Sequence, residues 1–130
     1  MAKQADGSVL VTSGGTQVLV TVCSATTIAP NADFFPLMVD YKEKFYAAGK
    51  FLGGFFKREG RPSNTEILLM RIVDRPLRPM FPEGYFYETI ITAQVLSYDP
   101  KCDPQILAGL GATASLMVSD IPLLAPVGFV

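Results

Sequence analysis

Apolar residues near the start of the chain fall into two β-branched runs separated by a pair of glycines. The runs cover residues 9–12 and 17–22, and Gly14-Gly15 lies between them. Glycine readily adopts the positive φ angles of a two-residue primed turn, so the pattern predicts a β-hairpin. Both runs are apolar almost throughout, which indicates a sheet that is covered on both faces.

A glycine-rich stretch precedes the first predicted helix. Residues 47–61 contain four glycines and show neither the strand period nor the helix period, which is typical of a loop. Just beyond it, the Ser63 side chain can cap a helix and Glu66 can complete a capping box. This helix should end near residues 74–75, because Pro76 lacks the amide proton that a helix interior requires.

The remaining apolar segments predict further strands and a second helix. Strands are expected at about 36–41 and 89–98, and Asp103 with Pro104 marks the start of the second helix. Each glycine inside that helix costs about 1 kcal/mol against alanine, and tight packing against another backbone is a sufficient reason for it. The order of elements predicts an α+β fold with α/β-type layers, in which a mixed β-sheet packs against helices.

The distribution of charge adds a functional indication, because the net charge is near zero although the middle of the chain is basic. The 130 residues carry a formal net charge of -1, yet nine of the eleven Lys and Arg residues lie within 42–78, together with four acidic residues. That window has a charge of +5, and the rest of the chain has a charge of -6. Such asymmetry indicates an anionic partner, although a solvated charged face would give the same pattern.

The numbers of histidines and cysteines limit which catalytic chemistry the chain can perform and indicate its cellular compartment. The chain has no histidine and only two cysteines, Cys23 and Cys102, which excludes Ser/His and Cys/His nucleophiles and histidine-ligated zinc. We expect both cysteines to be small buried hydrophobes, and two free thiols fit a reducing cytoplasm. The first residues lack the apolar core of a signal peptide, and the longest uncharged run is too short for a membrane span.

No self-contained catalytic or metal site is expected. The aspartates are scattered singly, mostly at predicted strand or helix ends where capping accounts for them. No segment matches a phosphate-binding or dinucleotide-binding fingerprint. We therefore predict neither a catalytic residue nor a metal ligand in this chain.

The most informative segment is GGFFKREGRPS, residues 53–63, in which two phenylalanines adjoin three cations. Exposed rings here could stack on bases, worth about 1–3 kcal/mol per base, while the cations hold phosphates. Burial would instead stabilise the fold by about 1.5–3 kcal/mol per ring and pin the loop to the core. The candidate nucleic-acid contacts are Phe55, Phe56, Lys57, Arg58 and Arg61.

The first predicted helix adds arginines to the basic window. Arg71 and Arg75 are four residues apart and therefore on one face, and Arg78 lies just beyond them. Such a row favours an opposing anion, so Arg75 and Arg78 are also candidate nucleic-acid contacts. The alternative is structural, with these two guanidinium groups bonding to loop carbonyls.

Several segments resemble the first core domain of the polynucleotide phosphorylase family. GGFFKREGRPS is the most specific of them, and the ADGS that opens the hairpin also follows the family pattern. The similar segments are 33–50, 53–63, 71–85 and 111–122. The resemblance runs from about residue 2 to residue 130. It implies that residues 1–130 are a partial first ribonuclease PH-like domain, incomplete at both ends, without a second domain.

The resemblance implies a function in RNA degradation. Family members are phosphorolytic 3′-to-5′ exoribonucleases that use inorganic phosphate and Mg²⁺ to release nucleoside diphosphates. They form homotrimeric rings, act in the cytoplasm and can join RNA-degradation complexes. By resemblance, residues 55–58 line the central channel and guide single-stranded RNA, with Arg61 as a further contact. The catalytic residues and the Mg²⁺ ligands would then belong to a second core beyond Val130.

Two alternatives to this function stay open. One is a non-catalytic RNA-binding ring subunit of an exosome-like assembly, and the other is a structural domain whose basic window serves subunit contacts. Either way, phosphate binding is not expected at the second predicted helix. The family's phosphate pocket is a serine-rich helix start, whereas the Asp103 carboxylate would occupy the corresponding amides and repel phosphate.

Overall fold

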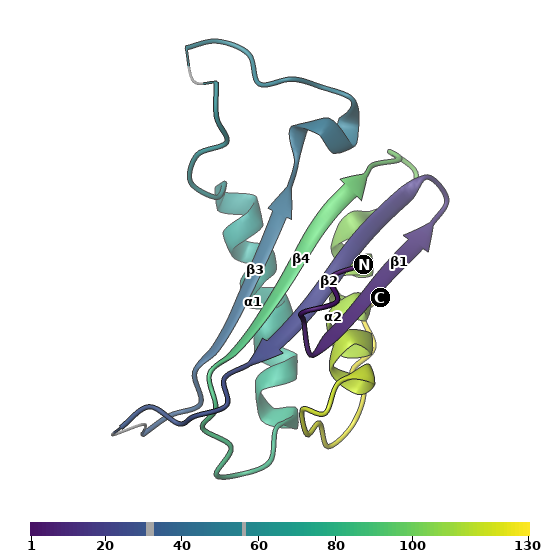
Figure 1. The fold of residues 1–130 in the computed structure, drawn as a ribbon. Coiled ribbons are helices and arrows are strands. Elements are labelled where there is room, and N and C mark those ends of the chain that lie inside the picture. Colours follow the sequence, from purple (N-terminus) through teal and green to yellow (C-terminus); the bar gives the residue numbers. More distant parts are fainter. Residues whose placement is uncertain (31–32, 56) are drawn as a thin grey trace.

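A computed structural model describes residues 1–30, 33–55 and 57–130 (Figure 1). The strands are β1 (Gly7–Ser13), β2 (Thr16–Ser24), β3 (Leu37–Glu43) and β4 (Thr89–Ser97). The helices are α1 (Asn64–Leu77) and α2 (Pro104–Val118), with short 3-10 helices η1 (Phe45–Ala48) and η2 (Arg78–Met80). In the described ranges the strands form one sheet in the order β1-β2-β4-β3, in which only the β3–β4 pair is parallel. The predicted α+β fold, a mixed sheet packed against helices, is confirmed.

The predicted hairpin is present, and the glycine pair forms its turn. Ser13 pairs with Thr16, which leaves Gly14-Gly15 as the two-residue connection between β1 and β2. Gly14 has a φ of 55°, which a residue with a side chain would adopt less readily. The turn therefore fixes the register of the two strands.

Both helices cover the same face of the sheet, and the other face is open (Figure 1). Val18 and Val20 are fully buried beneath the helices, whereas the β2 residues between them are only partly buried. On the open face Cys23 and Met38 are exposed, and Cys102, at another position, is half-buried. The expectations of a doubly covered sheet and of buried cysteines are therefore wrong. Strand propensity favours β-branched residues on either face, so an apolar run does not by itself indicate burial.

Helix α1 extends beyond its expected end at 74–75. Pro76 lies inside the helix, Leu77 is fully buried at its end, and the backbone N–H of Arg78 still donates to the Asp74 carbonyl. Pro76 removes one helical hydrogen bond, and burial of the Leu77 side chain offsets this loss by about 1.5–3 kcal/mol. Tertiary packing thus overrides the local signal of the proline.

Helix α2 lies close to β1 and β2, and glycines make this approach possible. A Cβ atom at Gly7 would lie 2.2 Å from the carbonyl oxygen of Ser115, and one at Gly111 would lie 2.5 Å from Val20 Cγ2. Both distances are shorter than van der Waals contact, so neither position has room for a side chain. Gly111, inside α2, is therefore tightly packed as the sequence indicated, although its neighbour is the Val20 side chain and not another backbone.

We expect Gly7→Ala to lower the free energy of unfolding by about 1–3 kcal/mol, because the added methyl group would meet the backbone of α2. Urea denaturation followed by circular dichroism measures the loss. Gly53→Ala is the matched control, since a Cβ atom there meets nothing within 4 Å. Equal unfolding midpoints for the two variants would contradict the close approach of α2 to β1.

Candidate nucleic-acid interface

The basic aromatic segment forms a loop that projects from one end of the sheet (Figure 1). The chain leaves the carboxyl end of β3, passes through η1 and returns at the start of α1. The described residues within 49–62 form neither helix nor strand, so the predicted loop is confirmed. Gly49 and Gly54 have φ angles of 66° and 81°, which glycine adopts without strain. Residues 49–62 are called the glycine-rich loop below.

The Glu59 carboxylate turns back from the loop to the segment where the loop begins. One oxygen accepts a hydrogen bond from the backbone N–H of Phe45 at 3.2 Å, and the other pairs with the Lys44 ammonium group. The hydrogen bond between the two side chains lowers the pKa of Glu59 and raises the pKa of Lys44 from their usual values. Both groups are therefore charged near neutral pH, and together they close the base of the loop.

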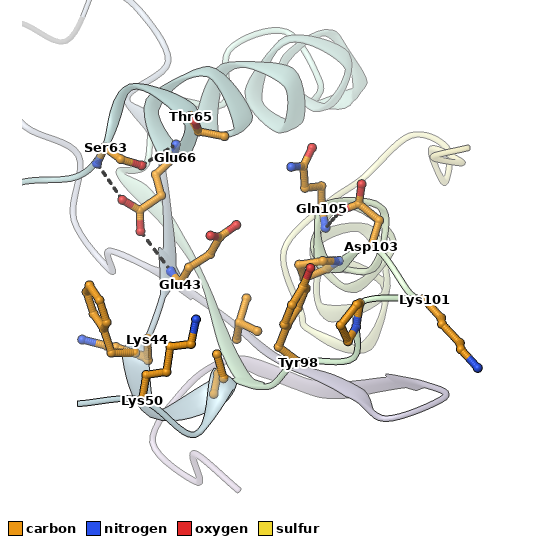
Figure 2. A pocket seen from close by; sticks show the side chains of 16 residues that line it. Glu43, Lys44, Lys50, Ser63, Thr65, Glu66, Tyr98, Lys101, Asp103 and Gln105 are labelled. Atoms are coloured by element: carbon orange, nitrogen blue, oxygen red, sulfur yellow. Dashed lines mark hydrogen bonds between the residues drawn. The ribbon is translucent and has the colours of Figure 1, made fainter. Parts of the chain in front are cut away.

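A second carboxylate, that of Glu66, ties the other end of the loop to β3 (Figure 2). It accepts the backbone N–H of Ser63 at 2.6 Å and the backbone N–H of Glu43 at 3.0 Å. In return, the Glu66 N–H donates to Ser63 Oγ at 3.2 Å. The predicted capping box is confirmed, and its glutamate also satisfies an amide at the end of an edge strand.

The exposed fraction of Phe55 is 92%, so the alternative of a buried ring is wrong for this residue. Phe56 lies outside the described residues. Lys57, Arg58 and Arg61 are exposed, and within the described ranges none of them forms an ion pair. The structure thus brings a predicted ring and the three predicted cations of this segment together on one exposed loop.

Phe51 is a further exposed ring of the glycine-rich loop, and it is not among the candidate contacts that the sequence indicates. Its exposed fraction is 96%, and the neighbouring Lys50 is exposed as well. The signal for Phe51 is a third phenylalanine, directly after a lysine, in the same glycine-flanked stretch. Because it lies two residues before the GGFFKREGRPS motif, recognition of the motif alone does not find it.

The two candidate arginines of the helix differ in their surroundings. Arg78 donates to the carbonyls of Phe35 at 2.7 Å and Leu37 at 3.1 Å, and to the Asp74 carboxylate at 2.8 Å. It therefore joins the end of α1 to the beginning of β3, which is the structural alternative for this residue. The exposed Arg75 side chain has no hydrogen bond or ion pair with other described residues. A direct RNA contact by Arg75 or Arg78 stays a prediction.

A cavity of about 760 Å³ opens at the carboxyl ends of β3 and β4, between the beginnings of α1 and α2 (Figure 2). Its charged lining consists of Glu43, Glu66, Asp103, Lys44, Lys50 and Lys101. Close to these carboxylates, the Tyr41 hydroxyl donates to Glu43 at 2.8 Å. Burial and this hydrogen bond raise the pKa of Tyr41 above its usual value, so the tyrosine is neutral.

Capping side chains accept hydrogen bonds from backbone amides at the beginnings of both helices. The Ser63–Glu66 box caps α1, and the Asp103 carboxylate accepts the backbone N–H of Gln105 at 2.9 Å at the start of α2. The predicted N-cap at Asp103 is confirmed. A carboxylate in this position competes with any anion for the helix amides and repels it.

The part of the chain that the structure describes contains neither a metal-binding cluster nor a membrane-spanning helix. There, no group of three or more His, Cys, Asp or Glu side chains is arranged to hold a metal ion. None of the helices in the same part is long and apolar enough to cross a membrane.

The chain matches the family model described as the 3′ exoribonuclease family, domain 1, over residues 1–122. It is 59% identical over 123 residues to the polyribonucleotide nucleotidyltransferase of Chlorobium phaeovibrioides. It is 57% identical over 130 residues to the protein of the same name from Methylacidiphilum infernorum. The two alignments cover 94% and 100% of this chain but only 17% and 18% of the relatives. The chain therefore spans less than a fifth of their length.

A solved structure shares the fold. It is a chain of the Archaeoglobus fulgidus exosome with RNA bound to the active site, and it superposes with a TM-score of 0.65 at 26% identity. The superposition covers 94% of this chain and 50% of that one. This similarity and the family match confirm the predicted ribonuclease PH-like fold.

We expect Arg78→Ala to lower the free energy of unfolding by about 1.5–3 kcal/mol, because two backbone carbonyls lose a charged donor. Arg75→Ala, on the same helix, should change it by less than about 0.5 kcal/mol. Thermal or urea unfolding of both variants measures the difference. Similar losses for the two arginines would contradict the structural role of Arg78.

Proposed function

The chain belongs to the 3′ exoribonuclease family, and we propose that it is part of a polyribonucleotide nucleotidyltransferase, a phosphorolytic 3′-to-5′ exoribonuclease. In this reaction inorganic phosphate attacks the 3′-terminal phosphodiester of RNA and releases a nucleoside diphosphate. Relatives with this name are 55–60% identical to the chain, whereas the exosome chain is 26% identical. The difference favours this enzyme over a non-catalytic RNA-binding ring subunit of an exosome-like assembly.

Within the whole protein, this domain binds single-stranded RNA and guides it towards the catalytic site. The observation that carries this role is the exposed ring of Phe55 beside three cations that, among the described residues, have no ion-pair partner. Stacking of a base on such a ring is worth about 1–3 kcal/mol and does not depend on sequence, because every base has a π face. Arg58 can hold a phosphate through two parallel hydrogen bonds, whereas Lys57 acts as a point charge.

Phosphorolysis is assigned to another part of the protein. Three lysines and three carboxylates line the cavity, but the Asp103 cap and the Ser63–Glu66 box occupy amides that phosphate would need at the helix beginnings. We propose that the catalytic residues and the ligands of Mg²⁺, which would support the transfer when bound, lie outside these 130 residues.

The proposal includes a homotrimeric ring in the cytoplasm, with the glycine-rich loop facing the central channel. The same loop would contribute Phe56 and Arg61 to the RNA path, and Arg75 would extend it along α1. Similarity to a chain of an RNA-bound exosome supports an assembly that binds RNA. Participation in RNA-degradation complexes belongs to the same proposal.

We expect Arg58→Ala in the full-length protein to raise the KM for long single-stranded RNA roughly ten- to hundredfold, as the loss of one charged hydrogen bond worth about 1.5–3 kcal/mol would. The KM for RNA too short to reach the loop should stay the same. Steady-state phosphorolysis of both substrates at several salt concentrations measures this, and the salt slope should fall by about 1. Lys3→Ala, which removes an exposed cation elsewhere, is the control. Equal losses on long and short RNA would refute the channel role.

We expect the isolated 130-residue chain to release no nucleoside diphosphate from RNA in the presence of phosphate and Mg²⁺. Chromatography of the reaction products tests this, with the full-length protein as the positive control. Phosphate-dependent release of nucleoside diphosphates by the isolated chain would place the chemistry in this domain and overturn the assignment.

A further inference from the structure

Glu59 is the one acidic residue of the glycine-rich loop, which contains four cations. On charge alone it would weaken the attraction of the loop for RNA phosphates. Its contacts indicate a different role, because the carboxylate is bound at the base of the loop by Lys44 and by the Phe45 amide. The ion pair with Lys44, which lies outside the loop, neutralises Glu59 within the protein and leaves all four loop cations to attract an anion.

The two contacts of Glu59 restrain a segment that has few other restraints. They join Glu59 to Lys44, which is 15 positions earlier in the sequence, and to Phe45, which is 14 positions earlier. Near the start of this segment, Gly49 N–H donates to the Tyr46 carbonyl at 2.9 Å and Lys50 N–H donates to the Phe45 carbonyl at 3.0 Å. Residues 51–54 and 57–58 have no backbone hydrogen bond to another described residue. For residues 57–58, the contacts of the adjacent Glu59 therefore supply a restraint that their own backbone does not.

We propose that Glu59 is a positioning residue for RNA binding. Its carboxylate closes the loop before RNA arrives, so that Phe55 and the neighbouring cations are already held together on one surface. A loop that is ordered in advance loses less conformational entropy on binding, which raises its affinity. This inference rests on the proposed function of the glycine-rich loop.

Two roles of Glu59, repulsion of RNA phosphates and positioning of the loop, predict opposite changes in KM for Glu59→Ala in the full-length protein. Removal of a repulsive charge would lower the KM for long RNA. Loss of positioning should instead raise this KM, roughly three- to tenfold, with kcat unchanged, as expected when one or two immobilised side chains become free. Glu59→Gln should give a smaller increase, because the amide oxygen can still accept the Phe45 N–H.

Glu83→Ala is the matched control, since it removes an exposed carboxylate outside the loop, and it should leave the KM for long RNA unchanged. A KM that falls, or stays the same, in Glu59→Ala would overturn the positioning role. An equal increase in Glu59→Ala and Glu83→Ala would overturn it as well, because the effect would then not depend on the contacts that Glu59 makes at the base of the loop.

Hydrogen exchange measures the closure of the loop without RNA. The Phe45 amide of the free full-length protein should exchange faster in Glu59→Ala than in the wild type, since it loses its acceptor. Unchanged exchange would overturn the closure itself.

Phe55→Ala separates a failure of this inference from a failure of the proposed function. Its control is Phe34→Ala, because Phe34 is 70% exposed and lies before β3 rather than after it. If neither phenylalanine variant raises the KM for long RNA, the RNA-binding role of the loop is wrong. If Phe55→Ala raises this KM and Glu59→Ala does not, only the positioning role is wrong.

Discussion

The backbone amides at the carboxyl end of β3 need hydrogen-bond acceptors, and the exposed surface beyond it depends on how the chain supplies them. Among the described residues β3 is an edge strand, with no neighbouring strand on its outer side. Glu66 accepts the N–H of Glu43, and Glu59 accepts the N–H of Phe45. Both acceptors follow the strand in sequence, so their hydrogen bonds turn the chain back and determine where the glycine-rich loop begins and ends.

Elements with a local cause could be predicted from the sequence. The Gly14-Gly15 turn and the Ser63–Glu66 capping box need only residues that are close in the chain, and both form as expected. Pro76 misled the prediction because the burial of Leu77 depends on distant residues and outweighs one missing hydrogen bond. The open face of the sheet was missed for a related reason, since the identity of a strand residue reflects propensity as well as burial.

The candidate site could be predicted in its residue types and not in its surroundings. GGFFKREGRPS indicates base stacking and phosphate contacts, but the exposure of Phe55 depends on how the loop is anchored. That anchoring involves Lys44, fifteen residues before Glu59. Likewise, Arg75 and Arg78 are equivalent as residue types, and only the fold places Arg78 beside the Phe35 carbonyl, 43 residues away in sequence. Such long-range neighbours leave no local signal.

The two anchoring carboxylates have a consequence for how this fold can vary. They hold the two ends of the glycine-rich loop beside one strand end, so the number of residues between Phe45 and Glu59 is largely independent of the sheet. The entropy of closing a flexible segment grows with the logarithm of its length, and a doubling costs only about 0.6 kcal/mol. Insertions and deletions there would change how far an aromatic side chain reaches and leave the pairing of β3 with β4 intact. The reach of the loop and the architecture of the sheet can therefore change independently among homologous domains.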